Sequence, residues 1–542
     1  MRLCYPLALA LALAAPVAAQ GYTCDNGTPN RCTVDPGIGT LNAAVAAEGD
    51  DNTVFALQRG ALYVLDGQVT NAGYHLRLEA TGSATRPPVV QPAANTDGST
   101  PDRSFRLEGD FTATGIYFLG MDDNGGLQSQ YFRVYQPDVT VTLDDCIGDY
   151  SRFAFIRFEA ADGDVRIQNS LFRNNLQPGN SGNGRLVVSF RVPIDSVVIR
   201  NSTIVGLGGG IFTTERELAN YFELVHTTVY LSANGFLYDN GATTVRDMKV
   251  TDNLFVDVAL VGNETNSANP NGLFTVVGLD GVDLADRNIE FSNNNYAFTE
   301  RGQQYFTNAS NREPRLFYSE ATTGEIWDAL RASGAIEDAT TEAISFDTLP
   351  PEDEVADFFA YAKEFFVDNQ TGDFTDPAID EDADPAGPPK PGSVVEVFPF
   401  TLDLSYPQTT AAYSGATGGC PLGDLNWFED DAAVNVDECL RLATPSEGGP
   451  EVAATALRVF PNPARTTATL SFELDAPAEV GVRVYDLLGR QVLSVPTRAL
   501  AAGPQPTALD VAALGAGVYV YRVTVDSASG TSVQSGKLVV VR

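Results

Sequence analysis

The segments VVIRNSTI (197–204) and FELVHTTV (222–229) follow one another along the chain and share one pattern. Across these and the further copies, positions one and three are mostly apolar, positions two and four are mostly polar, and positions five and six hold mostly small polar residues. Alternation with a period of two is typical of a β-strand with one buried face. The repetition predicts an array in which each copy is one structural unit. Five further copies are FTATGIYF (111–118), VTLDDCIG (141–148), VRIQNSLF (165–172), MKVTDNLF (248–255) and IEFSNNNY (289–296).

Position five of the repeat is where each strand is expected to turn. Asn and Asp tolerate left-handed backbone and hydrogen-bond their own chain, so a column of them predicts stacked turns. His226, one of two histidines in the chain, stands in this column, and we interpret it as a turn residue rather than a catalytic base. Cys146, at position six, is interpreted as a small buried residue. The residues at position five are Gly115, Asp145, Asn169, Asn201, His226, Asp252 and Asn293.

A second strand is expected before most copies, in FRLEGD (105–110), FRVYQPD (132–138), IRFEAAD (156–162) and FRVPID (190–195). Two or three short strands per unit, with turns stacked on turns, predict an all-β fold of the parallel β-helix type. Successive coils of such a solenoid lie about 4.8 Å apart. PGIGTLNAAVAA (36–47) is expected to cap the first coil, and helices are expected over 323–334 and 351–366 towards the other end.

The coil segments, GTLNAAVAA (39–47) and PLGDLNWF (421–428) together resemble the pectate-lyase-like β-helix superfamily. The resemblance covers roughly residues 36–440 and is closer to the secreted β-helix proteins of Gram-negative bacteria. It implies a right-handed coil. Because the superfamily includes lyases, hydrolases, epimerases and non-enzymes, it implies a fold and no single activity.

The N-terminus and the composition predict an exported protein. Residues 1–19, MRLCYPLALALALAAPVAA, have the basic start, the apolar run and the small-residue cleavage site of a secretory signal peptide. We see no later run suited to a membrane-spanning helix. The formal net charge is −36, which argues against non-specific nucleic-acid binding. We interpret this charge as a solubility device, with many calcium sites as the alternative, and we expect a monomer.

Five cysteines remain once Cys4 leaves with the signal peptide. In an oxidising compartment we expect two short-range disulfides, Cys24–Cys32 and Cys420–Cys439. No zinc-site spacing is present among these cysteines.

The last part of the chain is expected to form a separate small β-sandwich, because alternating apolar strands are separated by turns. Its motifs resemble the type A C-terminal sorting domain of type IX secretion. This resemblance implies an immunoglobulin-like sandwich, handling by the type IX secretion machinery, and export across both membranes. It also implies removal of the tail, followed by attachment to the cell surface or release. The resembling residues are Pro461, Asn462 and Pro463, the run from Tyr485 to Arg490 with Gly489, Gly517, and Lys537 near the C-terminus.

The sequence therefore predicts six regions along the chain. These are the signal peptide (1–19), an N-terminal cap with the first coils (20–104), the clear β-helix coils (105–300), a closing region of irregular helices and loops (301–440), a linker (441–456) and the sorting domain (457–542).

A row of arginines is the main candidate for substrate binding. Arg106, Arg133, Arg157 and Arg191 follow an apolar residue in each of the four preceding strands. In register they would form an outward row about 4.8 Å per step. Like charges at that spacing repel unless anions lie between them. The anions are either neighbouring carboxylates such as Glu108 and Glu159, or an acidic polysaccharide held by arginine–carboxylate pairs.

A second outward row is mixed in charge and contains Arg166, Arg200, Glu223 and Lys249. The resemblance would place the groove of a polysaccharide lyase here. Such lyases use Lys or Arg to remove the proton beside a uronate carboxylate, which makes Lys249 the candidate lysine base. Asp380, Asp382 and Asp384 alternate and could converge on Ca²⁺, the one cofactor that the sequence suggests, although they lack a turn glycine and a clear distal glutamate.

Three functions are compatible with these patterns. The protein could bind acidic polysaccharide at the cell surface or after release, cleave uronate-containing glycans as a lyase or hydrolase, or serve as a structural surface protein without a ligand. The absence of an obvious paired-carboxylate motif in the sequence favours the first and third over the second.

Overall fold

The chain divides into two compact units, Met1–Cys439 and Leu440–Arg542. Each is described by itself. The computed structural model describes residues 21–542 except 178–181, 216, 235–243, 268–269, 277–278, 280–283, 285–286, 309–310, 321–324, 351, 367–401, 444–454, 461, 463, 475–476, 487–490, 513, 516 and 528–529.

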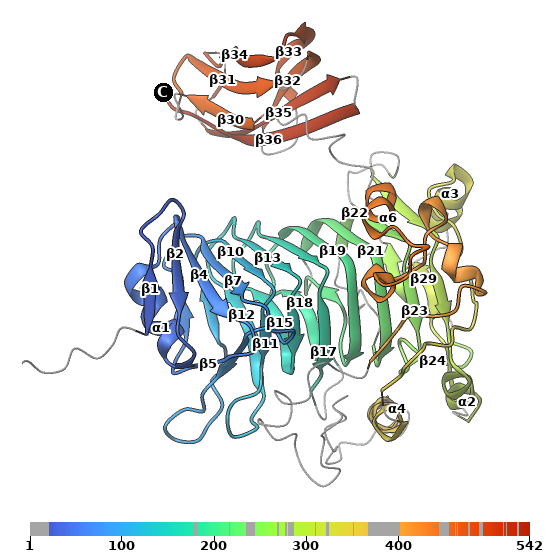
Figure 1. The fold of residues 1–542 in the computed structure, drawn as a ribbon. Helices are drawn as coiled ribbons and strands as arrows, with labels where there is room; N and C mark the ends of the chain where they lie inside the picture. Colours follow the sequence, from blue (N-terminus) through green and yellow to red (C-terminus); the bar gives the residue numbers. More distant parts are fainter. Residues whose placement is uncertain are drawn as a thin grey trace, which may run out of the picture. The chain divides into compact units, whose positions relative to one another are not determined.

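The described strands of the first unit stack mainly into three parallel ladders (Figure 1). The first ladder contains β2 (Asn30–Val34), β4 (Thr53–Gln58), β7 (Leu76–Thr81), β10 (Phe111–Thr114), β13 (Thr140–Asp144), β16 (Asp164–Gln168), β19 (Ile194–Leu207), β21 (Leu218–Ser232), β22 (Thr244–Thr251) and β26 (Ile289–Ser292). The second contains β3 (Gly37–Ile38), β5 (Leu62–Leu65), β8 (Val89–Pro92), β11 (Tyr117–Leu119), β14 (Ile147–Asp149), β17 (Leu171–Asn175), the far halves of β19 and β21, β23 (Leu254–Val256) and β27 (Asn295–Ala297). The third contains β6 (Val69–Thr70), β9 (Phe105–Leu107), β12 (Gln128–Val134), β15 (Ser151–Phe158), β18 (Arg185–Ser189) and β20 (Phe212–Thr213).

The register of the first ladder follows the sequence repeat. The residues at position one pair from strand to strand, starting with Phe111 opposite Val141 and ending with Met248 opposite Ile289. The unit is therefore mostly β, with a long parallel sheet and a solenoid-like fold that is consistent with the expected β-helix. The right-handed coil stays a prediction from the resemblance.

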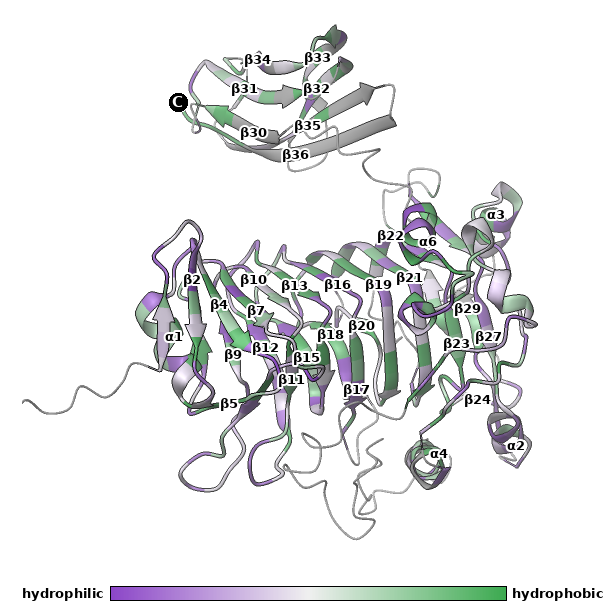
Figure 2. Cartoon of the chain, in the orientation of Figure 1, coloured by the Kyte–Doolittle hydropathy of each residue, from purple (hydrophilic) through white to green (hydrophobic). Residues whose placement is uncertain are grey.

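Aromatic side chains fill the interior of the coils. Phe105, Phe118 and Phe132 are fully buried, and their ring centroids lie 5.1 to 6.2 Å apart. Burying such a side chain contributes roughly 1.5–3 kcal/mol. Figure 2 shows hydrophobic residues interleaved with hydrophilic ones along the coil strands, as a period of two requires.

The turn column has the backbone that the sequence indicated. All seven residues at position five have positive φ, from 44° at Asn201 to 72° at Gly115. Their side chains also link coils, since Asn201 Nδ2 donates to Asn169 Oδ1 at 2.8 Å and Asn293 Nδ2 donates to Asp252 Oδ1 at 3.0 Å. Stacked amides and carboxylates thus satisfy one another along the solenoid.

Residues 416–428, which we name the return segment, lie against this turn column. The amide of Leu425 donates to Asn201 Oδ1 at 2.8 Å, and the amide of Thr417 donates to Asp252 Oδ1 at 2.8 Å. A disulfide joins Cys420, within the segment, to Cys439, which follows the segment in the chain. The segment includes η3 (Thr417–Gly419) and η4 (Leu425–Phe428), and lies between η2 (Ala411–Ser414) and α6 (Val436–Ala443).

The ends of the first unit carry its helices. At the N-terminal end, α1 (Thr40–Glu48) buries Leu41, Ala44 and Val45, while β1 (Tyr22–Cys24) pairs antiparallel with β2 and is joined to it by the Cys24–Cys32 disulfide. Further elements near the other end are β24 (Asn263–Glu264), β25 (Gly272–Val276), α2 (Glu300–Asn308), β28 (Arg312–Glu313), β29 (Leu316–Glu320), α3 (Glu325–Ser333) and α4 (Glu352–Phe366).

The second unit is all β among its described residues after α6. One sheet contains β30 (Thr455–Phe460), β31 (Thr467–Leu474) and β34 (Gly503–Asp510), and the other contains β33 (Gln491–Leu500), β32 (Ala478–Asp486), β35 (Gly517–Ser527) and β36 (Gly530–Val540). Their buried residues, including Leu470, Val484 and Leu538, form one core. In the described part of the whole chain, no helix is long and apolar enough to cross a membrane.

Candidate functional site

Three of the four predicted row arginines lie side by side on the third ladder. Arg133 pairs with Arg106 on β9 and with Arg157 on β15. Side chains at paired positions of neighbouring parallel strands are about 4.8 Å apart along the ladder. The three side chains are between 13% and 33% exposed, so they line the surface without projecting freely into solvent.

The expected register was wrong at Arg191. Val188, not Arg191, pairs with Arg157, because the fourth strand is β18 and ends at Ser189. Arg191 lies in the following turn with φ 59°, and its guanidinium sits 5.1 Å from the ring centre of Phe190. The prediction from the repeated Phe-Arg dipeptide therefore assigned to Arg191 a ladder position that Val188, three residues earlier, occupies.

Aromatic rings lie under the arginine row. Arg106 sits 3.8 Å and Arg133 sits 5.3 Å from the ring centre of Tyr135, while Arg157 sits 4.0 Å from that of Phe190. A cation over an aromatic face gains roughly 0.5–2 kcal/mol and holds the guanidinium plane in place. Tyr135, Phe153 and Phe190 are half-buried, so part of each ring is accessible. We call the arginine row with these rings the arginine–aromatic face.

Neighbouring carboxylates occupy part of the arginine row. Glu159 Oε1 accepts from Arg133 Nε at 2.8 Å and pairs with Arg157 Nη2 at 2.8 Å, while Glu108 accepts from Arg106 Nε at 2.6 Å. Glu108 and Glu159 are the neighbouring carboxylates that the sequence suggested as one of two alternative partners of the row. They do not satisfy every donor of the row, because Arg157 Nε is buried without a hydrogen-bond partner.

The arginine row and the arginines next to it outnumber the carboxylates that they contact. Six arginines against four carboxylates leave two positive charges, in a chain whose net charge is −36. This local excess of positive charge attracts anions. The arginines are Arg103, Arg106, Arg133, Arg157, Arg185 and Arg191, and the carboxylates are Asp102, Glu108, Glu159 and Glu215.

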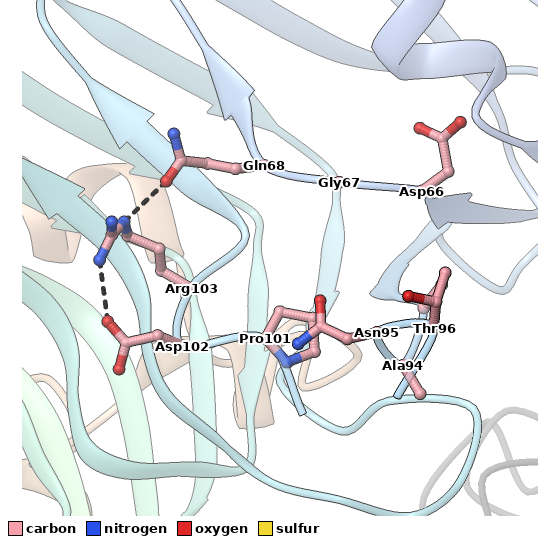
Figure 3. A pocket seen from close by; sticks show the side chains of 10 residues that line it. Asp66, Gly67, Gln68, Ala94, Asn95, Thr96, Pro101, Asp102 and Arg103 are labelled. Carbon is pink, nitrogen blue, oxygen red and sulfur yellow. Dashed lines mark hydrogen bonds and ion pairs between the residues drawn. The ribbon is translucent and has the colours of Figure 1, made fainter. Parts of the chain in front are cut away.

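A cavity of about 370 Å³ opens beside this face. Figure 3 shows Gln68, Asp102 and Arg103 gathered on one side of it, with Asp66 and Thr96 on the other. Arg103 donates to Gln68 Oε1 at 2.7 Å and to Asp102 Oδ2 at 2.8 Å. Asp102 also accepts from Arg133 Nη1 at 3.2 Å, so the cavity wall and the arginine row share a residue. No sequence pattern indicates this cavity, because three separate loop segments build it.

The second predicted row lies on the first ladder. Arg166 pairs with Val198 and is exposed, while Arg200 Nε donates to Glu223 Oε1 at 2.5 Å. Tyr221, which the sequence did not single out, donates its hydroxyl to the other oxygen of Glu223. Lys249 pairs in register with Glu223 on one side and Glu290 on the other. The candidate base thus lies between two acidic residues, where ion pairing is the simplest role for its ammonium.

His226 is fully buried within the turn column. Its Nδ1 lies 3.2 Å from the carbonyl oxygen of Gly423 in the return segment, and burial lowers the pKa of its imidazole. Cys146 is also buried, and burial raises the pKa of its thiol to about 12. A thiol so protonated is a poor nucleophile. Both residues join coils, in agreement with their interpretation from the repeat.

The remaining candidates divide between described and undescribed residues. Asp380, Asp382 and Asp384 lie outside the described residues, and so do Pro461, Pro463 and Gly489. Within the described part of the chain, no group of three His, Cys, Asp or Glu side chains is set to hold a metal ion. Asn462 Oδ1 accepts from the amide of Val539 at 2.7 Å, Gly517 begins β35, and Lys537 on β36 pairs with Val520.

Comparison with known families supports the assignment of the second unit. Residues 458–540 match the model of the secretion system C-terminal sorting domain. No curated protein matches this chain. The C-terminal unit therefore indicates that the protein is exported by type IX secretion. The matched residues lie outside the solenoid, so the function of the solenoid has to be inferred from its own residues.

Proposed function

We propose that the exported solenoid binds acidic polysaccharide through the arginine–aromatic face. The observation that carries this proposal is the row of Arg106, Arg133 and Arg157 on three neighbouring strands, each stacked on an accessible ring. A guanidinium can hold a carboxylate or sulfate through two parallel hydrogen bonds. The rings add flat apolar surface on which the faces of sugar rings can rest.

The repeat of the solenoid suits an extended polymer. Equivalent arginines recur about every 4.8 Å along the ladder, so successive acidic groups of a polymer could each contact one. Several weak contacts of this kind strengthen the binding together, because once one acidic group of the polymer is bound, the next groups are held near their arginines at high effective concentration. Export and a location outside the cell would bring such polymers within reach, and we propose surface attachment or release after the tail is removed.

The test is retention on acidic polysaccharides by affinity electrophoresis. Arg133→Ala with Arg157→Ala should abolish retention on alginate, pectate or sulfated glycans, while the matched control Arg31→Ala, from an exposed ion pair elsewhere, should not. The double lysine variant should lose most of the retention, since lysine keeps the charge but not the planar fork. Unchanged retention of the double alanine variant on all three would refute the proposal.

The same panel separates binding from cleavage. We expect no rise in unsaturated-uronide absorbance with or without calcium. A rise that Lys249→Ala or Glu223→Ala removes would instead favour the lyase alternative, because Arg200, Tyr221 and Glu223 already form a connected polar cluster there.

A further inference from the structure

We propose that the cavity beside the arginine–aromatic face binds one uncharged sugar unit, so that the face selects polysaccharides in which neutral and acidic sugars are neighbours. This inference rests on the proposed function and adds to it the kind of polymer that is recognised.

The cavity is built from segments of adjacent coils. Residues 66–68 follow β5, residues 93–96 follow β8, and residues 101–103 precede β9. Hydrogen bonds fix the middle segment, since the amide of Ala93 donates to the Leu65 carbonyl at 2.8 Å and the amide of Ala94 donates to Asp123 Oδ1 at 2.7 Å. This middle segment is therefore held in place before a ligand arrives, which reduces the entropy lost on binding.

The charges of the lining favour a neutral ligand. Asp102 is paired with both Arg103 and Arg133, whereas Asp66 forms no ion pair in the described part of the chain. The uncompensated charge of the lining is therefore negative and disfavours an anionic sugar. This is the reverse of the arginine row next to it. The two neighbouring sites thus discriminate between sugars by charge.

The polar groups of the lining suit sugar hydroxyls. Among the described residues, the Asp66 carboxylate and the Thr96 hydroxyl have no hydrogen-bond partner. The side chain of Asn95 uses only its Nδ2, which donates to Ser99 Oγ at 3.0 Å, so its amide oxygen is not engaged within the described ranges. A carboxylate, a hydroxyl and an amide oxygen together can accept from several hydroxyl groups. Sites built to hydrogen-bond hydroxyl groups strongly reject ligands that lack them.

The size of the cavity fits a single unit. Small-molecule sites usually measure about 300–1,000 Å³, and the cavity lies at the lower end with about 370 Å³. Asp102 connects it to Arg133, and Arg103 lies 5.5 Å from the ring centre of Tyr135, over which Arg106 also sits. A polymer with one unit in the cavity can therefore place the next unit over Tyr135 and the arginine row.

Two polymers test the inference with the full-length exported protein. Hyaluronan alternates an uncharged and an acidic sugar, whereas polygalacturonate contains acidic sugars alone. The variant Asp66→Ala with Thr96→Val should weaken hyaluronan binding about fivefold or more, as expected for the loss of one or two hydrogen bonds. It should not weaken polygalacturonate binding, because removing the Asp66 charge relieves repulsion of an acidic sugar.

The controls distinguish this inference from the proposed function. Asp97→Asn, in the same loop but outside the lining, should change neither affinity. Arg133→Ala with Arg157→Ala should weaken both polymers, and if it weakens neither, the proposed function fails. If the arginine variant weakens both polymers while the Asp66 and Thr96 variant weakens neither or both equally, the proposed function stands and the sugar cavity is refuted.

Discussion

The carboxyl group of Asp424 accepts a hydrogen bond from the hydroxyl of Thr203 at 2.7 Å, across 221 positions of sequence. Trp427 donates its indole N–H to the same hydroxyl oxygen at 2.8 Å, and the amide of Asp424 donates to Thr228 Oγ1 at 2.9 Å. The return segment is thus fastened to β19 and β21 by buried polar groups. Such groups stabilise only while every partner is in place.

Asp424 is expected to make stability depend on pH. Burial raises the pKa of its carboxyl from 3.8 to about 7, so the group takes up a proton on folding. A pKa that is higher in the folded state gives stability that is fully present below the unfolded value of 3.8 and is lost as the pH rises towards about 7. The variant Asp424→Asn has no ionisable carboxyl at this position, so it does not lose this stability as the pH rises. Its stability relative to wild type should rise by up to about 4 kcal/mol across that window.

The measurement for Asp424 is urea unfolding of both proteins at several pH values. His226, Asp252 and Glu429 lie near the segment and are present in both proteins, so the difference between the two reports mainly on position 424. A difference that stays flat between these pH values would show that the carboxyl is not protonated on folding.

His226 is expected to matter for its backbone and not for chemistry. Its φ of 46° costs an ordinary residue about 1–2 kcal/mol, whereas asparagine tolerates it. His226→Ala should therefore be less stable than His226→Asn by about 1–2 kcal/mol, and both should bind glycans as wild type does. Because burial lowers the pKa of His226, wild type alone should lose stability from this group as the pH falls through 6.5. Loss of binding in the folded asparagine variant would contradict the structural role.

The repeat predicted the solenoid well because its signal is local. Alternation with period two fixes which residues of a strand face inward, and the Asn and Asp column fixes where each strand turns. Together they set the register from Phe111 to Ile289 without any long-range information. Arg191 was misplaced for the same reason, since the dipeptide Phe190-Arg191 copied the local pattern while the strand ended at Ser189.

The parts that the sequence missed depend on distant residues. The contacts of Asp424 join positions about two hundred residues apart, and nothing in PLGDLNWF indicates which coil it meets. The cavity likewise needs the loops after β5 and β8 to meet the segment before β9. Local patterns locate strands and turns, whereas these features require the three-dimensional stacking of the coils.

The Cys420–Cys439 disulfide is expected to hold the return segment in place. It closes a loop with a sequence separation of 19, and a disulfide across such a loop contributes about 3 kcal/mol. Cys420→Ser with Cys439→Ser should lower the free energy of unfolding by that amount and expose residues 416–443 to limited proteolysis. Cys146→Ser is the control, because Ser170 and Ser202 fill the same position of neighbouring coils. Equal protease resistance of the double variant and wild type would exclude this role.

Glu159 is expected to compete with any acidic ligand of the arginine row. It engages both Arg133 and Arg157, and its side chain is 21% exposed, so an incoming carboxylate must displace it. Glu159→Gln keeps the shape but removes the negative charge, and we expect acidic polysaccharide to bind several-fold more tightly at low salt. The gain should shrink as ionic strength rises, because screening weakens partly exposed charge pairs. Isothermal titration at two salt concentrations measures both effects, with Glu79→Gln, whose partner is Arg31, as the matched control. Weaker binding by a folded Glu159→Gln variant would mean that this carboxylate positions the arginines for the ligand and does not compete with it.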